Sequence, residues 1–305
     1  MLPRLGQQPP IENGLRDWIL SGHYTVRPIS PSGLVQLEIS GLDFLVRHIA
    51  FDFERFSLAS LESFVVVGLE KQANNFAAWP LLKLYYSSFF AAHAIMRSQG
   101  AGVTLLSHQH VNYVNSIIDL LHPGTPNLSA GMYLYKTDSA HNGGVANVSL
   151  QKTQENGGGV HESFWKTFCR YLADDAAYAV TSGAADSTEY VAGADTLSRA
   201  ILEGGLGGGA WISSIRNEIN YQHKHETWYP LRRNAKAINA ISGISTMPSD
   251  AIRLDLSKQR DLIVAFRNVC HYLACLNIEV SNYLAASSTQ ARAFGQRWRR
   301  LSRVL

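Results

Sequence analysis

Apolar residues recur at helical spacing over most of the chain. The most regular stripe runs through Leu256 to Ala286 on an i, i+4, i+7 pattern: Leu262, Phe266, Val269, Leu273, Leu276, Val280 and Leu284. The same kind of spacing predicts further helices at residues 59–99, with a break near Pro80, and at 104–121, 161–180, 187–202 and 234–244. Ser57 or Ser60 is the expected N-cap of the first of these helices. The pattern therefore predicts a mainly α-helical protein.

Two regions depart from helical spacing. Residues 34–40 alternate apolar and polar side chains over most of their length, which predicts a strand. For residues 42–53, a helix fits the sequence nearly as well as a strand does. Met132–Lys136 and Val145–Leu150 are expected to pair as a β-hairpin across the turn-forming run at 141–144. We therefore expect a small mixed cap over residues 1–58 and a helical domain over residues 59–305, with a hairpin insertion at 127–159.

A polar face accompanies an apolar stripe between Gly207 and Pro230. The stripe consists of four residues at helical spacing: Trp211, Ile212, Ile215 and Ile219. The stretch is interpreted as one helix that Pro230 terminates. At about 100° per residue, Arg216, Asn220 and His223 would then project from one side of that helix. A permanent cation, an amide and a titratable imidazole would lie side by side, next to a face that must be buried.

These three groups suit phosphate chemistry. An arginine side chain is a planar donor that binds phosphate through two hydrogen bonds, and histidine exchanges protons near neutral pH. RNA carries its own nucleophile, the 2′-hydroxyl group, so a site that deprotonates it and stabilises the developing charge could cleave RNA without a metal. The spacing alone favours an ordinary surface arginine and a histidine at the edge of the core, because arginine and histidine two turns apart occur often by chance.

The order of residues on this helix resembles a known family signature. Arg216, Asn217 and His223 are similar to the R-x(4–6)-H motif of the HEPN superfamily (higher eukaryotes and prokaryotes nucleotide-binding), in which a polar residue often follows the arginine. The aromatic-rich and alanine-rich stretch from Trp79 to Arg97 resembles the early helix of that superfamily. The likeness extends over residues 60–285, with insertions, and its sharpest part is the short motif.

The resemblance implies an all-helical bundle, usually dimeric, whose paired motifs form one RNA-cleaving cleft. The implied activity is metal-independent endoribonucleolysis, without a cofactor or metal, in a bacterial toxin or an anti-phage defence effector. Arg216 would bind the scissile phosphate, His223 would be the general acid or base, and Asn217 would orient the phosphate or the histidine. Because one motif offers one histidine and the reaction needs both an acid and a base, a homodimer is expected on chemical grounds as well.

The implied partners are RNA, with tRNA and phage or host mRNA as candidate targets, and an antitoxin or another subunit of a defence complex. Candidate substrate contacts near the motif are Asn220, Tyr221, Glu218, Arg232 and Arg233. Trp228 and Tyr229 are further candidates because exposed aromatic rings stack on bases. His225 gains a role only if the helix ends near His223. On the early helix, Tyr86 or His93 could line the cleft; the alternative is ordinary core packing.

Two other interpretations stay open. The first is a non-catalytic HEPN-like module that binds RNA, nucleotide or a partner protein. The second is a purely structural subunit in which Arg216 pairs with an internal carboxylate. Arg267, Asn268 and His271 form a weaker copy of the motif, one residue short of the family's spacing.

Composition and charge set broader bounds. A hydrophobic content of 46% and a charged content of 17% describe a globular protein with a substantial core. The formal net charge of +3 is compatible with RNA binding but does not require it. The three cysteines, Cys169, Cys270 and Cys275, lack metal-ligand spacing and are expected to be buried thiols. With neither a secretory h-region nor an apolar run of about 20 residues, we expect a soluble cytoplasmic protein without a membrane contact.

Overall fold

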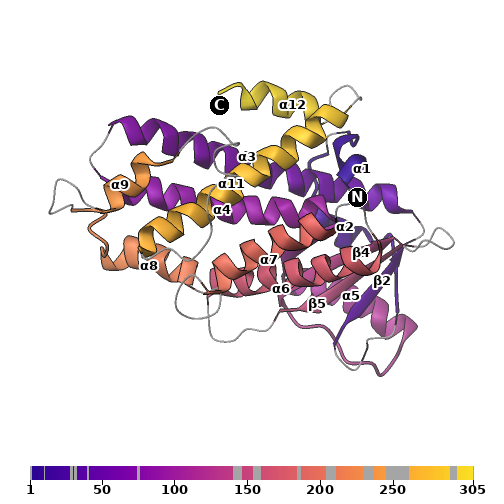
Figure 1. Cartoon of the computed structure of the whole chain (residues 1–305). Coiled ribbons are helices and arrows are strands. Elements are labelled where there is room, and N and C mark those ends of the chain that lie inside the picture. The colour runs from indigo at the N-terminus through magenta and orange to yellow at the C-terminus, as the bar shows by residue number, and fades with distance from the viewer. Residues whose placement is uncertain are drawn as a thin grey trace. The chain divides into compact units, whose positions relative to one another are not determined.

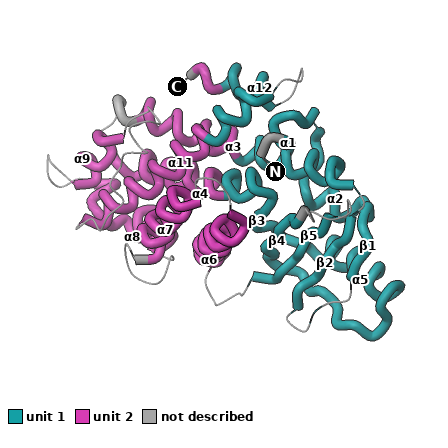
Figure 2. The backbone as a smooth tube through the Cα atoms, turned by 45° about the vertical axis from the view of Figure 1, so that its right-hand side comes forward, with its two compact units in different colours: residues 1–56, 93–154, 280–301 teal, residues 57–92, 155–279, 302–305 magenta. Residues whose placement is uncertain are grey.

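The computed structural model describes residues 2–9, 11–27, 30, 33–39, 41–73, 76–139, 146–153, 159–183, 187–203, 211–229, 236–244, 261–288 and 294–304. These residues are mainly helical and include a five-stranded antiparallel sheet (Figure 1), so the prediction of a mainly α protein is confirmed. The chain divides into two compact units (Figure 2). Unit 1 comprises residues 1–56, 93–154 and 280–301, and unit 2 comprises residues 57–92, 155–279 and 302–305.

Unit 1 contains the sheet, whose strands follow the order β1-β2-β5-β4-β3. Their bounds are β1 Thr25–Val26, β2 Val35–Ile39, β3 Ala101–Leu106, β4 Gly131–Ser139 and β5 Ala146–Lys152. The strand predicted at 34–40 is confirmed as β2, in which alternate residues are buried. Leu37 pairs with Val148 and Tyr135 pairs with Leu150, which sets the register of β5 between β2 and β4.

The predicted hairpin is confirmed as the antiparallel pair of β4 and β5, but it does not stand alone. Strand β5 also pairs with β2, and β4 also pairs with β3, so the hairpin forms the middle of a larger sheet. The expected turn at 141–144 lies outside the described residues. The hairpin therefore belongs to the core of unit 1, together with residues from the N-terminal part of the chain.

Strand β3 corrects the helix expected at 104–121. Residues Ala101–Leu106 pair with β4, and the helix α5 begins afterwards, at His108, and runs to Leu121. Ser107 is the N-cap of α5, with extended backbone dihedrals. A short apolar run fits a buried strand as well as a helix, so periodicity could not locate this boundary.

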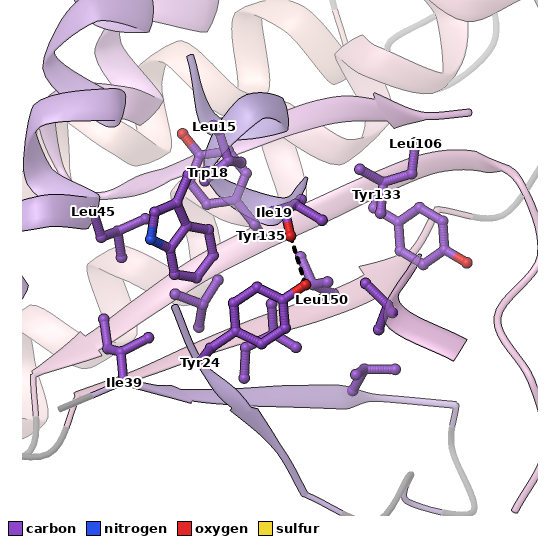
Figure 3. Packing of buried hydrophobic residues seen from close by; sticks show 14 of the residues in the cluster. Leu15, Trp18, Ile19, Tyr24, Ile39, Leu45, Leu106, Tyr133, Tyr135 and Leu150 are labelled. Carbon is purple, nitrogen blue, oxygen red and sulfur yellow. Dashed lines mark hydrogen bonds between the residues drawn. The ribbon is translucent and has the colours of Figure 1, made fainter. Parts of the chain in front are cut away.

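Helices α1 (Leu2–Gly6), α2 (Leu15–Ser21) and α5 contribute side chains to one core with the sheet. Figure 3 shows Trp18 and Tyr24 packed among aliphatic residues from the strands, and the Tyr24 hydroxyl donates to the Ile19 carbonyl at 2.7 Å. Helix α12 (Phe294–Leu301) also belongs to unit 1, where Arg297 forms an ion pair with Glu54. At least this arginine of the basic C-terminal segment is therefore paired within the fold.

A buried polar cluster in unit 1 accounts for His93. This imidazole is only 6% exposed, stacks on Phe56 at 4.6 Å and has the Arg97 guanidinium 3.1 Å from its Nδ1. Arg97 also donates to the Val103 carbonyl, and its Nε lies 4.0 Å from an Asp52 carboxylate oxygen. Of the two interpretations of His93, the structure supports a packed and hydrogen-bonded core histidine.

Helices are the main elements in the described part of unit 2. They are the second half of α3 (Leu42–Ala73), most of α4 (Ala78–Ser98), α6 (Val160–Thr181), α7 (Ser187–Glu203), α8 (Trp211–Gln222), α9 (Lys236–Ser242) and most of α11 (Leu262–Ser287). The helices predicted at 161–180 and 187–202 are confirmed. The three cysteines are free and buried, also as predicted. No helix in the described segments has the length and apolarity needed to cross a membrane.

The start of the long helical stretch differs from the prediction. Helix α3 begins at Leu42, so Ser57 and Ser60 lie inside it, fully buried, and neither is an N-cap. The Ser57 hydroxyl instead donates to the Asn277 side chain on α11 at 3.0 Å. The predicted break occurs between α3 and α4, and Pro80 lies in the first turn of α4, where proline is tolerated.

Candidate functional site

Helix α8 (Trp211–Gln222) carries the motif arginine in unit 2. Its predicted apolar stripe is confirmed, because Trp211, Ile212, Ile215 and Ile219 are each at most 3% exposed. Arg216 is half-buried and Asn217 is exposed on the remaining surface of the helix. The stripe therefore fixes the orientation of α8 and holds the base of Arg216 beside the core.

The end of α8 corrects the expected position of His223. The helix stops at Gln222, not at Pro230, and His223 has a φ of 51°. His225 and Glu226 also have positive φ values, of 65° and 51°. These left-handed conformations take the chain out of the helical path, so His223 does not continue the face of Arg216. Its side chain is exposed just beyond the carbonyl end of α8.

Contacts within unit 2 hold this loop in place. The Trp228 indole N–H donates to the Ile219 carbonyl at 2.6 Å, and the Thr227 carbonyl accepts bonds from the backbone N–H groups of Ala77 and Ala78 at 3.0 and 3.2 Å. The Trp228 ring lies 5.7 Å from that of His223. Because left-handed non-glycine residues cost about 1 kcal/mol or more, such anchoring is needed to maintain the loop.

We expect Trp228→Phe to lower the melting temperature by about 2 °C, because it leaves the Ile219 carbonyl without its side-chain donor at a cost of about 1 kcal/mol. Trp79→Phe is the matched control. The Trp79 ring contacts Trp228 edge-on at 5.4 Å, and its indole N–H makes no hydrogen bond with the described residues. Equal melting temperatures for the two variants, measured by circular dichroism, would contradict the anchoring role of the indole N–H.

Arg216 is surrounded by neutral oxygen groups and aromatic rings. Its Nη2 donates to the Tyr86 hydroxyl and its Nη1 donates to the Asn217 side-chain oxygen, each at 2.6 Å. The guanidinium carbon lies 5.4 to 5.9 Å from the ring centroids of Tyr85, Tyr86 and Tyr221. Its buried Nε makes no hydrogen bond with the described residues. The structure thus brings Tyr86 of α4 to the motif arginine.

Arg216 forms no ion pair with a described carboxylate. The nearest acid along α8, Glu218, bonds instead to His225 Nε2 at 2.7 Å and to Lys224 Nζ at 3.4 Å. Burial raises the pKa of Glu218, but the hydrogen bonds from His225 and Lys224 outweigh burial and the pKa is lowered. The internal pairing that a purely structural role requires of Arg216 is therefore not found among the described residues.

His161, in the first turn of α6, is a site residue that sequence reasoning did not single out. Its Nδ1 lies 2.9 Å from the Tyr85 hydroxyl, and its ring lies 4.4 Å from that of Phe89. Burial, and secondarily the charge of Arg216, lower the pKa of His161 to about 4. No local pattern indicates this residue, because its neighbours belong to α4 and α8.

The lowered pKa predicts an acid-sensitive contribution to stability. Because the unfolded imidazole titrates near 6.5, unfolding takes up a proton between about pH 6.5 and 4, so the contribution of His161 is full above that range and is lost as the pH falls. On acidification, we expect the free energy of unfolding of the wild type to fall by about 1–2 kcal/mol more than that of His161→Gln. Urea unfolding at several pH values measures both. His108→Gln, at an exposed histidine, is the control. Parallel curves for wild type and His161→Gln would contradict the prediction.

The remaining candidates divide clearly. Tyr221 is 70% exposed beside the Arg216 guanidinium, and Asn220 is half-buried on α8. Arg232 and Arg233 lie outside the described residues. In the weaker motif copy, Arg267 is half-buried, but Asn268 and His271 are enclosed in the core, with exposures of 5% and 1%. The histidine of that copy therefore cannot reach a dissolved substrate in this conformation.

Unit 2 thus gathers a cation, hydroxyl groups, an amide and an imidazole from α4, α6 and α8. In the described part of the chain, no group of three acidic, histidine or cysteine side chains has the arrangement of a metal site. Compared with models of known protein families, with curated proteins and with solved structures, the chain matches none.

Proposed function

We propose that unit 2 binds the sugar-phosphate backbone of RNA at Arg216 and cleaves it without a metal, as an endoribonuclease of the HEPN type. The observation that carries the proposal is the setting of Arg216, whose guanidinium is oriented by Tyr86 and Asn217 and lacks a carboxylate partner among the described residues. A partly buried guanidinium without a counter-charge favours an anion, and the planar group matches a phosphate.

Exposed aromatic side chains favour RNA over a small anion. Tyr221 is 70%, Tyr229 is 71% and Trp79 is 55% exposed. Trp79 contacts Trp228, which in turn contacts His223, so an aromatic surface adjoins the end of α8. Aromatic rings beside a cation stack bases whatever their sequence. Arg216 would hold the backbone while these rings hold the bases.

In the proposed reaction, Arg216 stabilises the charge that develops on the phosphate, and Asn217 keeps the guanidinium oriented. His223 is the proposed acid or base because it is exposed beside the aromatic surface. Because one copy offers one motif histidine and the reaction needs both an acid and a base, we propose a homodimer in which His223 of one copy would meet a phosphate bound by Arg216 of the other. A toxin or an anti-phage defence effector is the proposed setting, with an antitoxin or defence subunit as a partner.

The alternative is a module that binds RNA, nucleotide or a partner protein without cleaving. The end of α8 at Gln222 favours it, because His223 leaves the helical face that carries Arg216. The exposed His223 side chain could then contact a bound molecule without taking part in catalysis. Binding requires Arg216 and the aromatic rings, whereas cleavage also requires the imidazole.

The deciding experiment incubates the purified full-length protein with total RNA and with tRNA in excess EDTA. Discrete fragments that accumulate with time support a metal-independent nuclease. If the protein binds RNA but the RNA stays intact, the result supports the binding module and contradicts the enzymatic proposal. The absence of both cleavage and binding would overturn the assignment of Arg216 as an RNA site.

A further inference from the structure

The Tyr85 hydroxyl determines which nitrogen of His161 carries the proton. Tyr85 is fully buried, and its hydroxyl contacts the Trp165 indole N–H at 3.3 Å and His161 Nδ1 at 2.9 Å. Indole nitrogen only donates, so the hydroxyl accepts from Trp165. Burial raises the pKa of Tyr85, so the phenol keeps its proton. The acceptor that the described residues offer to that proton is His161 Nδ1.

His161 is therefore neutral, with Nδ1 accepting from Tyr85 and the proton on Nε2. A neutral imidazole carries one N–H, and an occupied acceptor at Nδ1 places it on Nε2. The Nε2 atom makes no hydrogen bond with the described residues. It is also not one of the buried polar atoms that lack a hydrogen-bond partner. The half-buried ring thus presents a fixed donor that has no partner among the described residues.

His161 and Arg216 share the same neighbours. The His161 ring lies 5.7 Å from the ring of Tyr85 and 6.1 Å from that of Tyr86. The Arg216 guanidinium lies 5.8 Å and 5.4 Å from the same two rings. The charge of Arg216 also acts on His161, which opposes protonation of the imidazole. The two side chains therefore belong to one electrostatic site, with one permanent positive charge and one neutral donor.

We propose that the Nε2–H of His161 is a second hydrogen-bond donor for the phosphate group held by Arg216, and that the site takes a phosphodiester. This inference rests on the proposed function of Arg216. A phosphodiester carries a single negative charge, which the one cation balances, while the neutral N–H adds a bond without adding charge. His161 is thus a binding residue, and its buried Tyr85 partner is a positioning residue.

Nitrogen-15 NMR of the wild-type imidazoles tests the tautomer directly. We expect His161 to give the Nε2–H pattern at pH 7, and its Nε2 signal to shift on addition of dUpU. This dinucleoside monophosphate lacks the 2′-hydroxyl needed for cleavage, so it reports binding alone. An Nδ1–H pattern would overturn the inference, as would a Nε2 signal that dUpU leaves unchanged while the Arg216 side-chain signals shift.

Two variants separate the donor from the fold. His161→Asn places its side-chain oxygen near the position of Nδ1 and loses the distal donor, whereas His161→Gln keeps a distal N–H. We expect the affinity for dUpU to fall about tenfold in His161→Asn and to stay within about threefold in His161→Gln. Equal affinities in the two variants would overturn the inference. If Arg216→Ala binds dUpU as well as wild type, the proposed function fails; if only Arg216→Ala weakens binding, the role of His161 alone fails.

Discussion

Arg216→Ala is expected to reduce RNA cleavage at least about 100-fold and to leave the melting temperature within about 2 °C of wild type. The large effect follows from the loss of the cation that faces the developing phosphate charge. The small change in stability follows from the setting of the side chain, which is half-buried and forms no ion pair with described residues. Gel-based cleavage rates and thermal melting measure the two quantities.

Matched variants make the result specific. Arg199→Ala removes another arginine of unit 2, which is 65% exposed and paired with Asp195 on the surface, so we expect it to cleave at the wild-type rate. Arg216→Lys keeps the charge but replaces the two donor nitrogens that bond to Tyr86 and Asn217 by a single nitrogen, which cannot bind a phosphate as a planar fork, so we expect little recovery of activity. Unfolding of Arg216→Ala at room temperature would point to a structural role for the arginine instead.

Periodicity predicted the parts of the fold that depend on local burial. The apolar stripe of α8, the helices α6 and α7, and the strand β2 follow from side chains that repeat every 3.6 or 2 residues. The same reasoning placed Arg216 outside the stripe, where the structure has it. These features can be predicted once the buried face of each element is known from the spacing of its apolar residues.

The errors lie where distant residues decide the backbone. His223 adopts a left-handed conformation that glycine or asparagine usually supplies, so no sequence signal marked the end of α8. That end is held by Trp228 and by the N-terminal turn of α4, which lies far away along the chain. Similarly, Ser57 looked like a cap but bonds to Asn277 on α11.

The site shows the same division. Arg216 and Asn217 were found through the motif, because they are adjacent on one helix. His161 was missed because it lies near Tyr85 and Arg216 only when α4, α6 and α8 pack together. The local sequence around a single histidine at the start of a helix does not indicate which distant residues it will contact.

His223→Asn is expected to reduce cleavage by about 100-fold or more while RNA affinity stays within about threefold of wild type. Asparagine tolerates the left-handed backbone of position 223, so this change removes the titratable imidazole without straining the loop. Cleavage rates in EDTA and RNA binding by fluorescence anisotropy, measured on the same preparations, separate the loss of proton transfer from the loss of binding.

His225→Asn is the matched variant, because His225 also has a positive φ and lies in the same loop. His225 bonds to Glu218 at 2.7 Å, so its imidazole is already engaged and we expect near-wild-type cleavage. A carboxylate that orients a histidine can equally prepare a catalytic base. Activity lost in His225→Asn and kept in His223→Asn would transfer the acid–base role to the His225–Glu218 pair. Equal cleavage by both variants and by wild type would contradict an acid–base role for either histidine.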